Sequence, residues 1–572
     1  MNNFFKLIKL ILQTLFLYIF TSVSPSLSLE NWHSGKSVSD YFSGIISLQD
    51  SKYKESYNFL RNLESLEENH LIYSKLYLET LVNNSKINEA YKYSKKLKKK
   101  NINFFQSDIV IISKLIKNND FQKANSYLTT VNKNYYTPLQ KLLRQVSSSW
   151  ILVEKSKLSY NEAQEIFKLI NPKYKNIKKI NDVFLNCYFD TQSVELKFQN
   201  LINDKKTDFS RYAFFYADYL LKKGDSKKAL FILNKKLNNV PRNLLLNQLH
   251  SDIKSKRKNF LQNSFNCKNI SNVIAELFYI TANALSTQSL HSFSNFYINL
   301  AKYLNQNFFS YNSLLAENFV MVKDYQKAEK IYLFLKEFGE NYSWHSSKQI
   351  ALLKIENSQS KKALTILEKS YKNLRSPNHY QTYDFAEFLK NNEEFEKSIK
   401  YYSNILDNIS KDHELYPKTK DGRGIAYERI GDWPKAEKDF LDSLAAKPNQ
   451  AYVINYLAYS WIEKGIKIEK SLKMLEEANR LRSNDGYITD SLGWALYKLK
   501  RYDKAKEYLK KAVQLMPSDP IVNDHFADIL WMIGDKLQAR YYWKYVLNLE
   551  ETKDDLKKTI MRKILDGPTV LN

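Results

Sequence analysis

The side chains best placed to do chemistry in this sequence are Asp524, His525 and Asp528. On a helix the two aspartates would share one face, because residues four apart lie above one another. Carboxylate and imidazole groups together can hold a divalent metal. Such a metal needs a third or fourth ligand from elsewhere in the chain, and the sequence indicates none. We therefore expect neither a metal nor a cofactor.

A second candidate is the stretch Ser34-Gly35-Lys36-Ser37, which superficially resembles a phosphate-binding loop. That loop needs another glycine at a fixed distance upstream, where this sequence has Glu30. The motifs of zinc proteases, serine hydrolases and dinucleotide-binding enzymes are also missing from the sequence. We therefore expect no catalytic residue and predict that the chain is not an enzyme.

The two cysteines, Cys187 and Cys267, lie far apart in the sequence and form no CxxC pair. A disulfide between them is conceivable in an oxidising compartment. The repeat described below, however, places them in different repeat units, both of them degenerate. We expect two buried or free thiols.

The composition favours helices as the elements that position these residues. Of 572 residues only 12 are glycine and 11 proline, while 44% are hydrophobic and 14% aromatic. Sheet-rich folds need more turn residues than this, whereas helices joined by short polar turns do not. The fold class is therefore predicted to be all-α.

Residues 1–28 have the three parts of a secretory signal. Two lysines precede an apolar run from Leu10 to Val23, and Ser26 and Ser28 suit cleavage after Ser28. We expect a cleaved signal peptide and export to the periplasm. The alternative is an inner-membrane anchor formed by an uncleaved N-terminal segment, although the run is short for a membrane span.

The chain is strongly basic, with a formal net charge of +26. Such a charge can attract nucleic acid, anionic lipid or acidic proteins, but export argues against nucleic acid as a partner. Three basic runs stand out, Lys92–Lys100, Lys173–Lys179 and Lys254–Lys258. They have two open interpretations: solvated helix faces, or contact with an anionic membrane surface.

A small residue recurs through the chain in steps of about 34 residues, or about twice that step. Where two helices cross closely, a side chain larger than alanine or serine would hold them apart. In the last four units a turn position precedes this small residue by five or six residues, with Gly431, Gly465, Lys500 and Gly534. The recurring small residues are Ser56, Ala90, Ala124, Ala163, Ala229, Ser294, Ala328, Ala363, Ser398, Ala436, Ser471, Ala505 and Ala539.

This pattern resembles the tetratricopeptide repeat, whose units each consist of two antiparallel helices, A and B. The resemblance implies a right-handed superhelical solenoid of roughly 13–15 helix-turn-helix units. Residues 485–497 and 523–531 also resemble large exported repeat proteins of Gram-negative bacteria. The expected organisation after the signal peptide is N-terminal units in 29–130, degenerate and divergent units in 131–308, a C-terminal array in 309–553, and a capping helix and tail in 554–572.

The capping helix is predicted between Asp554 and Asp566, because a solenoid needs a polar outer face at its end. Its apolar stripe should be Leu556, Ile560, Ile564 and Leu565, and its outer polar face Lys557, Lys558, Arg562 and Lys563.

In the family, four positions of each A helix point into a concave groove. In the four C-terminal repeat units, which match the family pattern best, these positions hold aromatic rings, carboxylates and one amide. Such side chains suit an extended, neutral-to-basic segment of another protein as the ligand. The alternative is structural: the carboxylates favour the helix dipole and the rings pack against the next A helix. The predicted groove residues are Asn455, Tyr459, Tyr487, Asp490, Trp494, Tyr497, Asp524, Asp528 and Trp531.

From these features we predict a protein–protein interaction scaffold or adaptor of the bacterial cell envelope. One alternative is an envelope assembly factor attached to the membrane surface through an uncleaved N-terminus and the basic runs. Another is a glycan-binding accessory of an envelope enzyme that uses its aromatic groove for stacking. The sequence indicates neither the partner's identity nor the oligomeric state.

Overall fold

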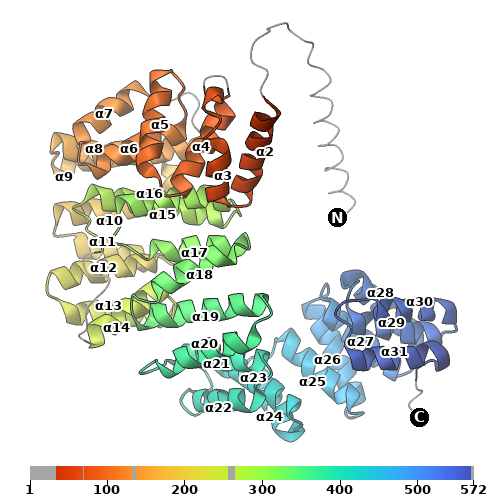
Figure 1. The fold of residues 1–572 in the computed structure, drawn as a ribbon. Coiled ribbons are helices and arrows are strands. Elements are labelled where there is room, and N and C mark those ends of the chain that lie inside the picture. The colour runs from red at the N-terminus through yellow and green to blue at the C-terminus, as the bar shows by residue number, and fades with distance from the viewer. Residues whose placement is uncertain (1–33, 68–69, 132–136, 256–263, 569–572) are drawn as a thin grey trace. The chain divides into compact units, whose positions relative to one another are not determined.

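A computed structural model describes residues 34–67, 70–131, 137–255 and 264–568 (Figure 1). These ranges contain 30 α-helices, α2 to α31, two short 3-10 helices and no strand. The all-α prediction is confirmed. The predicted signal peptide, residues 1–28, lies outside the described residues. Among the described helices, none has the length and apolar character needed to cross a bilayer.

The chain divides into two compact units, one ending at Tyr342 and one beginning at Ser343. The first unit contains α2 (Gly35–Gln49), α3 (Tyr53–Leu60), α4 (Leu71–Asn83), α5 (Ile87–Lys99), α6 (Phe105–Lys117), α7 (Phe121–Thr130), α8 (Pro138–Ser156), α9 (Tyr160–Lys168), α10 (Lys175–Phe189), α11 (Val194–Ile202), α12 (Arg211–Lys222), α13 (Ser226–Leu237), α14 (Leu244–Ser255), α15 (Ile270–Ser286), α16 (His291–Leu304), α17 (Tyr311–Met321) and α18 (Tyr325–Leu335).

Helix α19 (Glu340–Glu356) begins in the first unit and continues into the second. The second unit then contains α20 (Ser360–Lys372), α21 (His379–Asn391), α22 (Phe395–Leu406), α23 (Leu415–Arg429), α24 (Trp433–Ala446), α25 (Ala451–Glu463), α26 (Ile468–Leu481), α27 (Gly486–Lys498), α28 (Tyr502–Leu515), α29 (Pro520–Met532), α30 (Lys536–Leu547) and α31 (Asp554–Asp566).

The recurring small residues lie where paired helices cross, as predicted. All thirteen, from Ser56 to Ala539, are 0% exposed. A methyl group added to Gly493 of α27 would lie only 2.7 Å from Leu509 Cγ of α28. The A and B helices of a unit therefore touch through their small residues, and this close contact fixes the pairing.

Left-handed turns join the paired helices in the last units. Gly431, Gly465 and Gly534 have φ angles of 85°, 68° and 91°, a region that glycine adopts without steric penalty. Lys500 occupies the same turn position with a φ of 57°. The turn positions expected from the sequence are thus real turns, and one of them uses a lysine in a conformation unusual for it.

The first unit departs from a simple stack of neighbours, because its later helices return to its first helices. Helix α16 lies beside α4 and α6, and α15 contacts α6 and α8 (Figure 1). Tyr53 of α3 accepts a hydrogen bond from Asn295 of α16 at 2.8 Å and packs against Phe319 of α17. This return explains why α4 is buried on nearly all sides.

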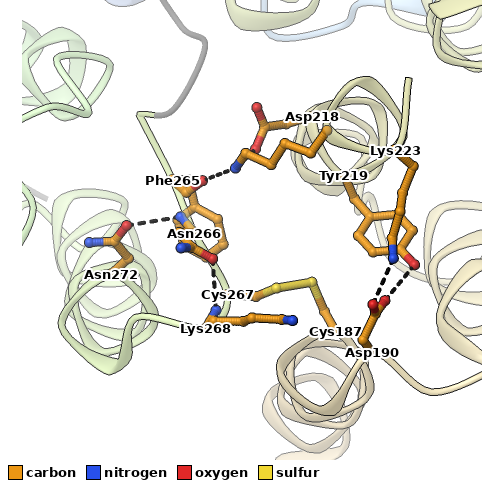
Figure 2. Close-up of a disulfide and its surroundings, with 11 residues drawn as sticks. Cys187, Asp190, Asp218, Tyr219, Lys223, Phe265, Asn266, Cys267, Lys268 and Asn272 are labelled. Atoms are coloured by element: carbon orange, nitrogen blue, oxygen red, sulfur yellow. Dashed lines mark hydrogen bonds and ion pairs between the residues drawn. A yellow bond between two sulfur atoms is a disulfide. The ribbon is translucent and has the colours of Figure 1, made fainter. Parts of the chain in front are cut away.

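The expectation of two separate thiols is wrong: Cys187 and Cys267 form a disulfide, with their Cα atoms 5.9 Å apart (Figure 2). Cys187 belongs to α10, and Cys267 to the segment just before α15. Phe265 holds that segment in place by packing against Phe184 and Phe215. The two cysteines do lie in different helix pairs, but the fold brings those pairs side by side.

Candidate partner-binding surface

The nine predicted groove residues belong to α25, α27 and α29, the A helices of three consecutive pairs. Each of these A helices contacts the next one, so their matching positions form rows along the second unit. The structure separates the predicted residues into two groups. The side chains of some residues make contacts within the protein, whereas those of others stay partly exposed to solvent.

Asp490 and Trp494 of α27 both contact His525 of the next A helix. Asp490 Oδ2 lies 2.9 Å from His525 Nδ1, and the Trp494 ring stacks on the imidazole at 3.9 Å. Burial alone would lower the pKa of His525, but the carboxylates of Asp490, Asp524 and Asp528 raise it above its usual value. The imidazole therefore links α27 to α29 through a hydrogen bond and a stacked ring.

Asp524 and Asp528 are neutralised from the C-terminal helix. Lys563 Nζ of α31 lies 2.8 Å from oxygens of both carboxylates, and Trp543 Nε1 donates to Asp524 at 2.9 Å. Burial and the Asp524 charge raise the pKa of Asp528 to about 6, although Lys563 opposes the change. A single ammonium group thus lies between the two aspartates first considered as metal ligands.

The capping helix α31 forms between Asp554 and Asp566 as predicted, but its faces were partly assigned wrongly. Lys563, expected on the outer polar face, is 9% exposed, while Leu565, expected in the apolar stripe, is 75% exposed. Lys563 faces inward, where it pairs with Asp524 and Asp528. The prediction for Lys563 was wrong because it placed the lysine on the outer face from its charge alone.

The predicted tryptophans are engaged within the protein. Trp494 is 8% exposed, donates from Nε1 to Glu463 at 2.6 Å, and stacks on Tyr497. Trp531 packs against Trp543, and a methyl group at Gly567 would lie 2.3 Å from its ring. Trp494 thus contacts the next A helix through His525, whereas Trp531 packs within the C-terminal end of the unit.

On α25, α27 and α29, the large side chains that stay exposed to solvent lie in the first turn of each helix. We call this row of side chains the exposed row. It consists of Tyr452, Tyr487 and Ile521, which are 53%, 58% and 46% exposed. Of these three, only Tyr487 is among the predicted groove residues. All three residues occupy the same position on successive A helices, and this shared position could have identified the two that were not predicted.

Half-exposed carboxylates flank the exposed row. Tyr452 donates to Asp485 at 2.8 Å, and Arg482 donates to the Tyr452 hydroxyl at 3.1 Å. Partial burial and the Asp519 carboxylate together raise the pKa of Tyr487. Asp485 and Asp519 are also the N-caps of α27 and α29, so each links one repeat's tyrosine to the next repeat's helix.

Two further predicted residues lie between these groups. Asn455 and Tyr459 of α25 are half-buried, and burial raises the pKa of Tyr459. In the described part of the chain, the Asn455 Oδ1 atom is buried without a hydrogen-bond partner. Asn455 thus retains an unused acceptor on the same helix as Tyr452.

The first basic run lies on α5, where several lysines already have partners. Lys96 and Lys100 bind Glu67 at 2.6 and 2.9 Å, and Lys98 lies over the Tyr127 ring. In the second run, Lys179 pairs with Asp204. Residues 256–258 of the third run lie outside the described residues, and both interpretations of the basic runs stay predictions.

The repeat geometry has counterparts among known proteins. A family model described as tetratricopeptide repeat matches residues 290–552. A TPR repeat-containing protein of Pseudomonas aeruginosa is 29% identical over 136 residues, which are 24% of this chain and 22% of that relative.

Solved structures also match this chain, at low identity and low TM-score. A chain of the Cut9–Hcn1 hetero-tetramer of the APC/C is 13% identical, with a TM-score of 0.36, over 93% of this chain and 97% of that one. A thermophilic TPR protein of Thermus thermophilus is 16% identical, with a TM-score of 0.29, over 33% of this chain and 100% of that one.

Proposed function

We propose that this chain, whose residues 290–552 match a tetratricopeptide-repeat family model, is a non-enzymatic scaffold or adaptor that binds a segment of another protein along the A helices of its second unit. Proteins built from this repeat offer a rigid row of helices on which side chains of successive units can contact one partner. The proposed binding surface runs along α25, α27 and α29.

The observation that supports this proposal best is the exposed row of Tyr452, Tyr487 and Ile521. Exposed aromatic side chains on a rigid scaffold provide contact area at little entropic cost, and they are enriched among residues that dominate binding. An extended segment can pass these positions one after another because they recur at the repeat spacing. The half-buried Tyr459, Tyr497 and Trp531 lie on the same helices.

The partner segment should be neutral to basic. Asp524 and Asp528 already pair with Lys563, and Asp490 already binds His525, so these carboxylates have little capacity left for recognition. Asp485 and Asp519, beside the exposed row, are half-exposed and accept hydrogen bonds. Carboxylates in this setting favour amide and cationic donors of a ligand.

Substitution of the exposed row tests this function. A Tyr452→Ala, Tyr487→Ala double variant should lose a partner in a crosslinking pull-down while its helicity by circular dichroism is unchanged. Tyr541→Ala is the matched control, because Tyr541 of α30 is 70% exposed but lies outside the row. Equal partner recovery from the parent protein and both variants would reject the row as the binding surface.

We also infer that the chain works in an exported, periplasmic setting, with inner-membrane anchoring as the alternative. The Cys187–Cys267 disulfide supports this, because disulfides form and persist in oxidising compartments. The predicted signal in residues 1–28 supports it from the sequence.

A further inference from the structure

The contact between the first and the later helices of the first unit has an unusual chemistry, and we call this contact the seam. It joins α4 and α6 to α16 and includes the contacts of α3 with α16 and α17. Asn83 of α4 donates to the Ser292 backbone at 3.3 Å, and Asn299 donates to Asn83 Oδ1 at 3.4 Å. Side-chain polar groups thus hold two parts of the unit that are far apart in the sequence.

The two ends of α16 are held by different groups. Near its first turn, the Ser292 hydroxyl donates to the Glu79 carboxyl of α4. At its last turn, Lys117 Nζ of α6 donates to the Leu304 carbonyl at 3.1 Å. A cation at this end is favourable because the last carbonyls of a helix lack partners within it.

Glu79 is the anomalous group of the seam. It is 7% exposed, its hydrogen-bond partner is a neutral hydroxyl, and among the described residues it makes no ion pair. Burial raises its pKa to about 7, even though the Ser292 hydrogen bond acts in the opposite direction. An isolated buried carboxylate is costly unless it takes up a proton.

Most of the charged and titratable groups on the surrounding helices have other partners, while burial lowers the pKa of Lys302 on α16 and raises that of Glu317 on α17. Lys327 of α18 binds Asp324 and the Ser51 carbonyl, and it lies over the Tyr53 ring. On α2, Lys36 is exposed and Asp40 half-exposed. The remaining engaged groups are Tyr53 with Ser51 and Asn295, His291 with Asn318, Lys114 with Asn88, Lys117 with Leu304 and Tyr93 with Ser74.

We propose that the seam is a pH-sensitive latch: α16 closes over α4 and α6 while Glu79 is protonated, and this closure weakens when Glu79 ionises. The closed seam binds the proton more tightly than an open one, in which water would solvate Glu79. Closure is therefore fully stable below the ordinary glutamate pKa and weakens as the pH rises towards about 7. Above that pH both forms are ionised and the stability levels off.

A buried thiol can report opening of the seam. Asn299 is 6% exposed in the seam, so an Asn299→Cys variant should react slowly with dithiodipyridine, and the native cysteines are already paired. Protection is the reaction rate of the unfolded variant divided by that of the folded one at the same pH. We expect protection to fall about tenfold or more between pH 5 and pH 7.5, since each unit of pKa difference gives a factor of ten.

Added to this reporter, Glu79→Gln should remove the pH dependence, because an amide keeps the Ser292 hydrogen bond without a charge. Glu89→Gln is the matched control: Glu89 lies on α5, is exposed, and pairs with Lys86. Lys117→Met should lower protection by a similar factor at every pH.

Persistence of the pH dependence in the Glu79→Gln protein would overturn the latch, as would full reactivity of the thiol at every pH. Circular dichroism checks that each variant is folded. If Asn299→Cys fails to fold, Asn83→Cys reports from the α4 side of the same contact, with the same expected and contrary results.

Discussion

The ammonium group of Lys563 lies 2.8 Å from both Asp524 and Asp528, and all three side chains are buried. A buried charge is tolerated when a partner of opposite sign and hydrogen bonds compensate for lost water. Here the partner comes from the capping helix, so one side chain joins α31 to the last repeat.

Lys563→Met should therefore lower the unfolding free energy of the protein by about 3–5 kcal/mol, because it leaves two buried aspartates without their cation. Urea denaturation followed by circular dichroism measures this loss. Lys558→Met, an exposed lysine of the same helix, should change it by less than about 0.5 kcal/mol. Similar losses in both variants would show that the buried pairing contributes little.

Sequence reasoning found the residues of this network but not their roles. The recurrence of Asp490 and Asp524 on successive A helices was visible, but the only internal role considered for these carboxylates was with the helix dipole. Their partners His525 and Lys563 could not be paired with them, because that depends on how the next helix turns. The groove prediction for these residues stays untested.

Helix pairs are the elements that set this fold, and the small residue at each crossing sets their separation. Ala505 of α28 is fully buried in the core that also contains Leu492 and Leu509. The recurring small residues allowed the repeat register to be predicted from the sequence, because close packing at each helix crossing permits few types of side chain.

Ala505→Leu should overpack the crossing of α27 and α28 and destabilise the protein by about 1–3 kcal/mol. Lys506→Leu adds the same side chain at an exposed neighbouring position and should stay within about 0.5 kcal/mol of the parent. Thermal and urea denaturation compare the two. Equal stability would mean that the crossing has room for a larger residue.

At the scale of the whole molecule, the return of α15 and α16 within the first unit is the feature that sequence reasoning missed. Its contacts join Asn83 to Ser292 and Cys187 to Cys267, pairs without any local periodicity between them. The degenerate repeats around both cysteines gave no register to place them. The family pattern fixes neighbours along the chain, whereas these contacts depend on where the chain turns back.

The disulfide should be present in the protein as it is isolated. Alkylation under non-reducing conditions should leave Cys187 and Cys267 unmodified, as measured by mass spectrometry. A Cys187→Ser, Cys267→Ser variant should be about 2–4 kcal/mol less stable, because the cross-link restricts the unfolded chain. Two alkylated thiols in freshly isolated protein would contradict the disulfide and weaken the inference of export.

The central claim is that a partner protein lies along the exposed row of the second unit. The most direct test places a photo-reactive phenylalanine analogue at Tyr487, and separately at Tyr541, and crosslinks the protein in its native cell fraction. The account predicts an adduct with one protein at Tyr487 and none at Tyr541, with the adduct lost when Tyr452→Ala is added. Adducts at Tyr541 alone, or equal adducts at both positions, would contradict it.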